Sequence, residues 1–232
     1  RKCDPDLAAK MAGRLSFAVV VATGKVGRAY LKPFFAQIYQ PLARSQVSSA
    51  LYCSTEWWLR YLCQHTPMTL RADERQRPRI WTWTDAAGAS KWIAAVVFDG
   101  QHWSWTRMLV PESLWSQFLH RRDDQIAMQE LPAIPVAYET FSKQLTHALW
   151  LLFVDNQGVL HGIIAGRSTA DDINFAIGQV WLDVARLQIS MYAFRVESGA
   201  NVADGPTRDE FRVLKQLGAR YYEPKLPKWA SN

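Results

Sequence analysis

The spacing of apolar residues changes in character near residue 80. Before it, apolar positions recur three or four residues apart, as in helices that bury one face. After it, short alternating or unbroken apolar runs predict strands over 80–84, 94–98 and 102–108, and Asp99-Gly100 supplies a turn between the last two. We therefore expect a helical segment followed by an antiparallel meander of three strands. The helical repeats are Leu7, Met11, Leu15 and Ala18 in one helix and Val47, Leu51, Trp58 and Leu62 in another.

The second half of the chain alternates between helical and strand patterns. The run 149–154 is almost wholly apolar, as in a central strand buried on both faces, and 189–196 reads as a fifth strand. Ser168 and Thr169 are candidate N-caps for one of the helices. The pattern predicts an α/β fold with a five-stranded mixed sheet flanked by helices, and a loosely held tail from Tyr222. The expected helices are 132–147, 158–165, 170–187 and 202–217.

The balance of basic and acidic residues also differs between the two parts of the chain. Residues 1–80 carry 13 Lys and Arg against 5 Asp and Glu, and residues 81–232 carry 14 against 16. A basic segment joined to a slightly acidic domain indicates either a surface for a polyanion or ordinary solvated helix faces. We place a basic helical segment at 1–70, an arginine-rich exposed linker at 71–79, the main domain at 80–220 and a tail at 221–232.

Cysteine content and apolar runs bear on the compartment. Three cysteines form no paired disulfide framework, and no apolar run approaches the roughly 20 residues that span a bilayer. Cys53, Cys63 and His65 lack a fourth ligand at zinc-like spacing, so we expect core cysteines. We expect an intracellular protein of the nucleus or cytoplasm, not secreted and without a membrane partner. The first residue, Arg1, suggests a piece of a longer chain.

Two acidic residues stand where strands end. Asp85 ends the first strand and Asp155 ends the apolar fourth one. If these strands are parallel neighbours, both side chains project into the crevice beyond the strands' carboxyl ends. Two carboxylates so close repel each other unless a cation lies between them, and oxygen ligands favour Mg²⁺ or Mn²⁺.

Four short motifs give the acidic residues a family context. Thr84-Asp85-Ala86 is followed by Gly88, and Ile126-x-x-x-Glu130 leads into a helix. Val154-Asp155-Asn156 comes next, and Asn201-Val202-Ala203-Asp204-Gly205-Pro206-Thr207-Arg208 comes last. In this order they resemble the ribonuclease H domain of retroelement reverse transcriptases over about residues 78–215. The basic helical segment is similar, more weakly, to the connection between polymerase and ribonuclease H in such elements.

The resemblance implies a ribonuclease H-like fold and a metal-dependent endonuclease that cuts the RNA strand of an RNA–DNA hybrid. It implies two Mg²⁺ (or Mn²⁺) ions, with Asp85 bridging both, Glu130 and Asp155 holding one and Asp204 the other. It also implies a polymerase domain or a larger nucleoprotein assembly as a partner. Candidate substrate contacts are Asn156, Arg195, Asn201 and Arg208.

The chain departs from the family pattern in two places. Pro132 and Pro135 stand where the family has helix, which would displace Glu130 and leave Glu139 as a substitute ligand. The loop 195–201 has no histidine, although many family members place one there. These departures leave open a weakened module that binds nucleic acid or serves as a scaffold. A transposase or junction resolvase of the wider superfamily is a further alternative.

One pair of aromatic residues has two interpretations. Trp103 and Trp105 alternate along one strand and therefore share a face of the sheet. They form either a stacking surface for nucleic acid or packing within the sheet.

Overall fold

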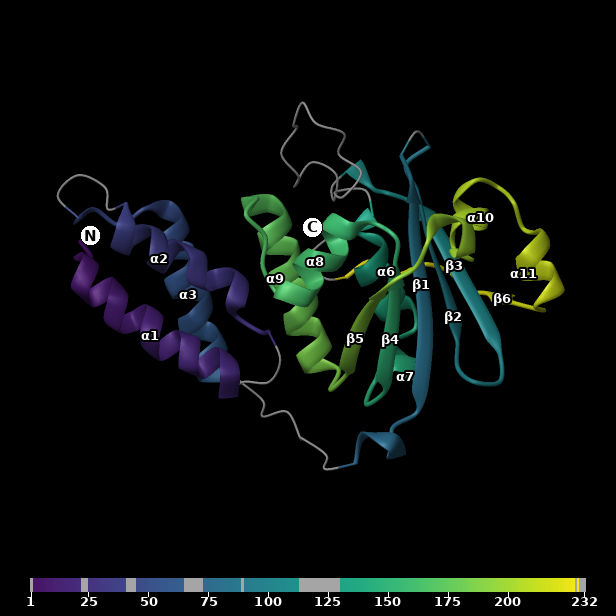
Figure 1. Ribbon diagram of the computed structural model, residues 1–232, viewed down its shortest axis with the longest axis horizontal. Helices are drawn as coiled ribbons and strands as arrows, with labels where there is room; N and C mark the ends of the chain where they lie inside the picture. The colour runs from purple at the N-terminus through teal and green to yellow at the C-terminus, as the bar shows by residue number, and fades with distance from the viewer. Residues whose placement is uncertain are drawn as a thin grey trace.

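The protein folds around one mixed sheet of six strands. The computed structural model describes residues 2–21, 25–40, 45–64, 73–88, 90–112, 130–227 and 229. Within these residues the strand order is β5-β4-β1-β2-β3-β6 (Figure 1). The strands are β1 (Arg79–Ala87), β2 (Trp92–Phe98), β3 (Trp103–Leu109), β4 (Leu149–Val154), β5 (Ser190–Arg195) and β6 (Arg220–Tyr221).

The strand pairing confirms the expected meander and the expected parallel core. β1 pairs antiparallel with β2, and β2 pairs antiparallel with β3. β4 lies parallel to β1 on one side and to β5 on the other. At Asp99-Gly100 the Asp99 carboxylate accepts hydrogen bonds from the backbone N–H groups of Gln101 and His102, which closes the turn. The carboxyl ends of β1, β4 and β5 therefore meet at one edge.

The main hydrophobic core lies between the sheet and three helices. Alternate residues of the central strands, such as Ile93, Trp150 and Leu152, point into this core and are fully buried. The Trp150 indole N–H donates to the Thr82 hydroxyl at 2.8 Å, so the polar atoms at its centre are paired. The helices over this face are α6 (Ala133–Thr140), α8 (Gln157–Ala165) and α9 (Asp171–Arg186).

The other face of the sheet is rich in aromatic side chains. Trp83 stacks on Trp103 and Phe153, with ring centroids 5.5 and 5.1 Å apart. Trp105 packs on Phe211, next to the short helix α11 (Arg212–Gln216). Trp103 and Trp105 thus share one face, as the alternation predicts, and their contacts are with other side chains of the sheet and its cover.

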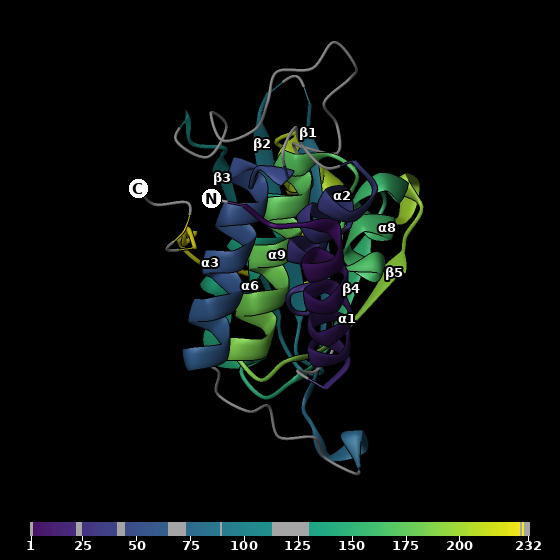
Figure 2. The same ribbon diagram turned by 90° about the vertical axis from the view of Figure 1, so that its left-hand side faces the viewer.

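The N-terminal helices form a separate layer that rests on α9 (Figures 1 and 2). The contact is made by a short 3-10 turn, η1 (Arg28–Leu31), where the Asn174 side chain donates to the Ala29 carbonyl at 2.7 Å. Gly178 allows the close approach, since a Cβ there would lie 2.8 Å from Tyr30. The layer consists of α1 (Pro5–Val21), α2 (Lys32–Tyr39) and α3 (Ser49–Gln64).

The faces that these helices bury agree only in part with the predicted ones: Leu15 on α1 and Leu51 and Trp58 on α3 are buried as expected. On α1 the buried residues are Ala8, Ala12, Leu15 and Val19, whereas Leu7 is 46% exposed. On α3 Leu62 is likewise exposed, and Tyr61 is buried in its place. Small side chains face inward on α1 because the neighbouring helix packs closely against it.

Two of the predicted helices are broken. The stretch 202–217 forms α10 (Asp204–Thr207) and α11, because Asp209 adopts a left-handed conformation with φ of 62° between them. The stretch 132–147 forms α6 and α7 (Ser142–Leu145), interrupted at Phe141. Pro135 is tolerated because it lies in the first turn of α6, where backbone N–H groups have no partner within the helix.

The C-terminal residues are more ordered than we expected. Arg220–Tyr221 adds a sixth strand beside β3, so the five-stranded sheet of the sequence prediction is incomplete. The Tyr222 N–H donates to the Trp105 carbonyl, and the Lys225 N–H donates to the Thr140 hydroxyl. The stretch from Tyr222 to Leu226 is therefore held against the domain.

Three local expectations were also wrong. Arg77, in the linker that we expected to be exposed, is 4% exposed and donates to the Gln188 carbonyl at 2.7 Å. Cys53 and Cys63 lie on exposed positions of α3, not in the core, because they point away from the helices that α3 contacts. The N-cap of α9 is Ala170, and Ser168 instead accepts a hydrogen bond from the Ala170 N–H.

None of the helices in the described part of the chain combines the length and the apolar character that a membrane span requires.

Candidate active site

Asp85 and Asp155 lie side by side at the carboxyl edge of the sheet. Thr84 and Val154 are register partners on the parallel strands β1 and β4, and an aspartate follows each of them in the chain. Asp155 comes directly after β4, as predicted, whereas β1 continues to Ala87, so Asp85 does not end its strand. Asp85 is 5% exposed, and the Thr207 hydroxyl donates to its Oδ2 at 2.7 Å. The Ser198 hydroxyl donates to Asp155 Oδ2 at 3.1 Å. The prediction that these two strands are parallel neighbours is confirmed.

The segment 201–208 brings the third carboxylate to this edge. Asn201 is buried, and its side chain donates to the Thr84 carbonyl at 3.0 Å while accepting from the Ala203 N–H. Asp204 then begins α10, and the Thr207 hydroxyl of the same turn reaches Asp85. The segment is thus bonded to β1 directly beside Asp85, which positions Asp204 at the same edge.

Glu130 lies at the site despite the nearby prolines. It is 7% exposed, and its Oε1 accepts a hydrogen bond from the Asn156 side chain at 3.3 Å. Because α6 begins only at Ala133, the prolines do not carry Glu130 away from the sheet edge. Glu139, the substitute considered above, instead forms an ion pair with Arg186 at 2.9 Å, away from this group.

Burial and neighbouring carboxylates raise the pKa of two of the acidic side chains. Burial raises the pKa of Asp85 to about 6, with smaller upward contributions from the charges of Asp155 and Asp204 and an opposing hydrogen bond from Thr207. Burial also raises the pKa of Glu130 to about 8, and the charges of Asp155 and Asp85 add to it. Asp85 is therefore within electrostatic reach of the other three. We call these four residues the carboxylate group.

Each member of the carboxylate group has one oxygen held by a neighbouring side chain. The donors are Thr207 for Asp85, Asn156 for Glu130, Ser198 for Asp155 and Arg208 for Asp204, the last at 2.7 Å. Two of the remaining oxygens, Glu130 Oε2 and Asp155 Oδ1, are buried without a hydrogen-bond partner. Buried carboxylate oxygens that lack a donor are costly unless a proton or a cation neutralises them.

The chemistry of this donor set suits a hard divalent cation, because Mg²⁺ and Mn²⁺ prefer carboxylate oxygens. In the part of the chain that the structure describes, however, no three His, Cys, Asp or Glu side chains are already arranged as ligands around one point. Holding an ion with three of the carboxylates therefore requires side-chain rotations from the positions seen here.

The four candidate substrate-binding residues differ in their exposure and in the hydrogen bonds that they already make. Asn156 caps α8, accepting from the Val159 N–H at 3.0 Å, and also donates to Glu130. Asn201 is 5% exposed with both ends of its amide engaged, so its position gives it a structural role. Arg195 is exposed at the end of β5. The Arg208 side chain is 63% exposed and pairs with Asp204.

Sequence reasoning gave no role to Thr207 or Ser198. Thr207 stands three residues after Asp204, so one helical turn places its hydroxyl next to the aspartate backbone, and this spacing was the available signal. Ser198 reaches Asp155 across a loop, a contact that no local pattern indicates.

Comparison with known proteins adds no family assignment. No protein-family model matches the chain, and no curated protein matches it in sequence.

Proposed function

We propose that the protein is a metal-dependent endonuclease that cuts the RNA strand of RNA–DNA hybrids, with a ribonuclease H-like fold. The observation that carries the proposal is the gathering of Asp85, Glu130, Asp155 and Asp204 at one sheet edge from four separate segments of the chain. Mutually repelling, partly buried carboxylates destabilise a fold unless they bind something positive.

The residues of the site would have different roles in binding the cations. Asp85 would contribute to two cation positions, since it interacts with Glu130 and Asp155 on one hand and with Asp204 on the other. Thr207, Ser198 and Asn156 orient the carboxylates by holding one oxygen of each. These carboxylates would hold Mg²⁺, which when bound would supply an activated water and stabilisation of the leaving oxygen of a phosphodiester.

Exposed basic residues near the carboxylate group would contact the nucleic acid. Arg195 and Arg208 are both exposed, and Arg208 can exchange Asp204 for a phosphate once a cation occupies that carboxylate. The basic segment 1–70 would add non-specific affinity for the polyanion. We place this activity inside the cell, in the nucleus or cytoplasm, next to a polymerase domain or within a nucleoprotein assembly.

The direct test is cleavage of a labelled RNA–DNA hybrid in Mg²⁺, in Mn²⁺ and in chelator, with duplex DNA and duplex RNA as competing substrates. We expect cutting of the hybrid alone, abolished by chelator. Asp155→Asn should lower the rate by at least ~10²-fold, because the amide is a poor metal ligand.

Asp171→Asn is the matched control. Asp171 is an exposed aspartate that begins α9 and pairs with Lys32 of α2, outside the carboxylate group, so the same chemical change there should leave cleavage intact. Hybrid binding without cutting in either metal would refute the nuclease and favour a scaffold. Cutting of structured DNA in preference to hybrid would instead point to a resolvase or transposase.

A further inference from the structure

A row of register partners crosses the sheet from the carboxylate group to β3. Asp85 of β1 is the partner of Ala94 on β2, and Ala94 is the partner of Arg107 on β3. Register partners point to the same face, so Asp85 and Arg107 share a face with two strand spacings, about 10 Å, between them. The alanine in the middle leaves room for α10, which packs over β1 and β2 at this point.

The helix α10 is too short to fix its own position. It spans only Asp204–Thr207, and a single turn leaves most of its backbone groups without a partner inside the helix. Yet it carries Asp204, and the Thr207 hydroxyl donates to Asp85 Oδ2 at 2.7 Å. Contacts from outside the helix must therefore hold these two groups of the candidate site in place.

Arg107 makes such a contact on the β3 side of α10. Its guanidinium donates to the carbonyl of Pro206, in the last turn of the helix, at 3.1 Å. The same guanidinium nitrogen pairs with the carboxylate of Asp209, in the left-handed turn that follows α10. A guanidinium that binds a backbone carbonyl and a carboxylate together fixes the end of α10 relative to β3.

Aromatic rings hold the guanidinium of Arg107 in turn. The guanidinium carbon lies 4.3 Å from the centroid of the Trp92 ring and 4.8 Å from that of the Phe211 ring. These rings come from the start of β2 and from the residue before α11, and the Arg107 side chain is only 22% exposed. An arginine that packs on aromatic rings loses much of the freedom of a surface side chain, so it can serve as a rigid support.

We propose that Arg107 is a positioning residue for the carboxylate group. It clamps the end of α10 so that Asp204 and Thr207 remain beside Asp85. The inference rests on the proposed function, because it concerns the cations that Asp85 and Asp204 would bind. It adds a residue that acts on the ligands through the backbone of α10.

Positioning and direct electrostatics predict opposite results for the loss of Arg107. A positive charge near carboxylates competes with a cation, so its removal alone should tighten cation binding. If Arg107 keeps α10 in place, its removal should weaken cation binding, because displaced ligands bind less well. The direction of the change therefore separates the two roles.

The first measurement is Mn²⁺ binding to the full chain, with free Mn²⁺ followed by electron paramagnetic resonance. We expect Arg107→Gln to weaken binding by ~10-fold, the usual scale for losing a residue that orients a metal ligand. Arg107→Lys keeps the charge and a donor and should recover part of the loss. Arg107→Gln combined with Thr207→Val should weaken binding by less than the product of the single effects, because both act through α10.

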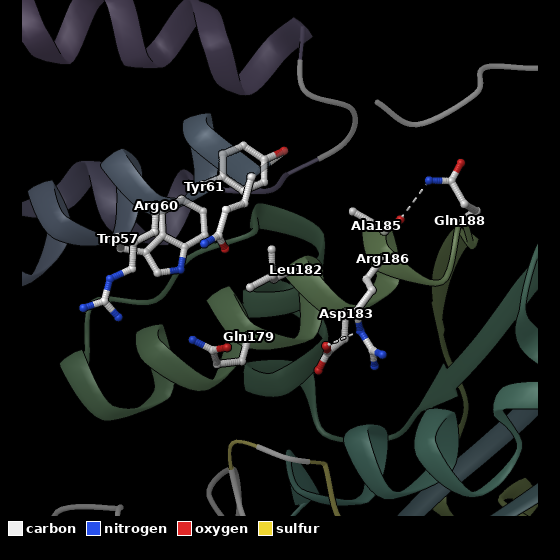
Figure 3. A pocket seen from close by; sticks show the side chains of 10 residues that line it. Trp57, Arg60, Tyr61, Gln179, Leu182, Asp183, Ala185, Arg186 and Gln188 are labelled. Carbon is white, nitrogen blue, oxygen red and sulfur yellow. Dashed lines mark hydrogen bonds and ion pairs between the residues drawn. The ribbon is translucent and has the colours of Figure 1, made fainter. Parts of the chain in front are cut away.

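Arg186→Gln is the matched control. Arg186 is also an arginine with two acidic partners, Asp183 at 3.1 Å and Glu139 at 2.9 Å, and it lines a pocket between α3 and α9 (Figure 3). It ends α9 just before β5 begins, at the edge of the sheet opposite to Asp155. Its loss should leave Mn²⁺ binding unchanged.

Asp209→Asn tests the clamp with Arg107 intact. The Asp209 side chain is 68% exposed and asparagine tolerates the left-handed conformation, so this variant should fold. We expect Mn²⁺ binding to weaken by ~3-fold, the scale of one exposed ion pair. Glu210→Gln removes the neighbouring exposed acidic side chain and should have a smaller effect, because it changes only the charge.

A second measurement needs no cation. Amide hydrogen exchange in chelator reports on α10 through the N–H groups of Arg208 and Glu210, which both donate to the Gly205 carbonyl. We expect Arg107→Gln to speed the exchange of these two amides and to leave the amides of α9 unchanged. If the unmodified chain binds no Mn²⁺, the proposed function is refuted, and the exchange rates still decide the role of Arg107. Unchanged exchange, or Mn²⁺ binding by Arg107→Gln that is as tight as that of the unmodified chain or tighter, overturns the proposal.

Discussion

Glu130→Gln should stabilise the protein above pH ~4.5, by an amount that grows until the pH reaches about 8. Glutamine keeps the shape of the side chain and removes a charge that is 7% exposed and faces Asp155. Burial first, and the Asp155 charge second, raise the pKa of Glu130 from 4.5 to about 8 in the folded protein. The folded state therefore binds a proton between these pH values that the unfolded state releases.

This proton determines the sign and the size of the effect of Glu130 on the free energy of unfolding. Below pH ~4.5 both states are protonated and Glu130 carries no penalty; as the pH rises toward 8 the free energy of unfolding falls. A pKa difference of this size corresponds to at most about 5 kcal/mol. We expect about 2 kcal/mol in practice, because an ionised Glu130 can turn toward water or bind a cation.

The measurement is urea unfolding in chelator at pH 5 and at pH 8.5. Glu130→Gln should match the unmodified chain at pH 5 and exceed it by about 2 kcal/mol at pH 8.5. Mg²⁺ at pH 8.5 should narrow the difference if the carboxylate group binds it. Glu139→Gln is the control on α6: it breaks the ion pair with Arg186, so it should destabilise slightly and equally at both pH values. A variant no more stable than the unmodified chain at pH 8.5 would refute the reasoning.

Two further substitutions test other parts of the structure. Thr207→Val removes the hydrogen bond to Asp85 Oδ2 and should raise the pKa of Asp85 further, shifting the acidic limb of the cleavage pH profile upward; an unmoved limb would contradict this. Gly27→Ala should lower the stability of the N-terminal layer by ~2 kcal/mol or more, because φ is 81° and the new Cβ would lie 2.3 Å from the Trp58 ring. Faster amide hydrogen exchange in α1 and α3 would report this loss of stability. Unchanged protection in these helices would contradict the close packing of Gly27 against Trp58.

Much of the candidate site was predictable because it sits on strongly patterned elements. The apolar run 149–154 and the alternation over 80–84 identified two strands; Asp85 lies near the end of β1 and Asp155 directly follows β4. The parallel pairing of β1 with β4, which the order of elements favoured, then brings Asp85 and Asp155 together. Local periodicity determines such features because it depends only on which face of an element is buried.

The position of Glu130 was decided by tertiary contacts. The sequence left its position in doubt because prolines follow it. The hydrogen bond from Asn156, and the charges of Asp155 and Asp85 that raise its pKa, show that it lies within the group. The same holds for Ser198, which reaches Asp155 from a loop. Contacts between residues far apart in the chain leave no periodic trace.

The sequence by itself determined the class of fold, the order of the strands along the chain and three of the acidic positions. Tertiary structure decided which face each N-terminal helix buries, and that Arg77 is enclosed while Cys53 and Cys63 are not. The reason is physical: the period of a pattern selects helix or strand, whereas burial of a given side chain depends on the element that packs against it.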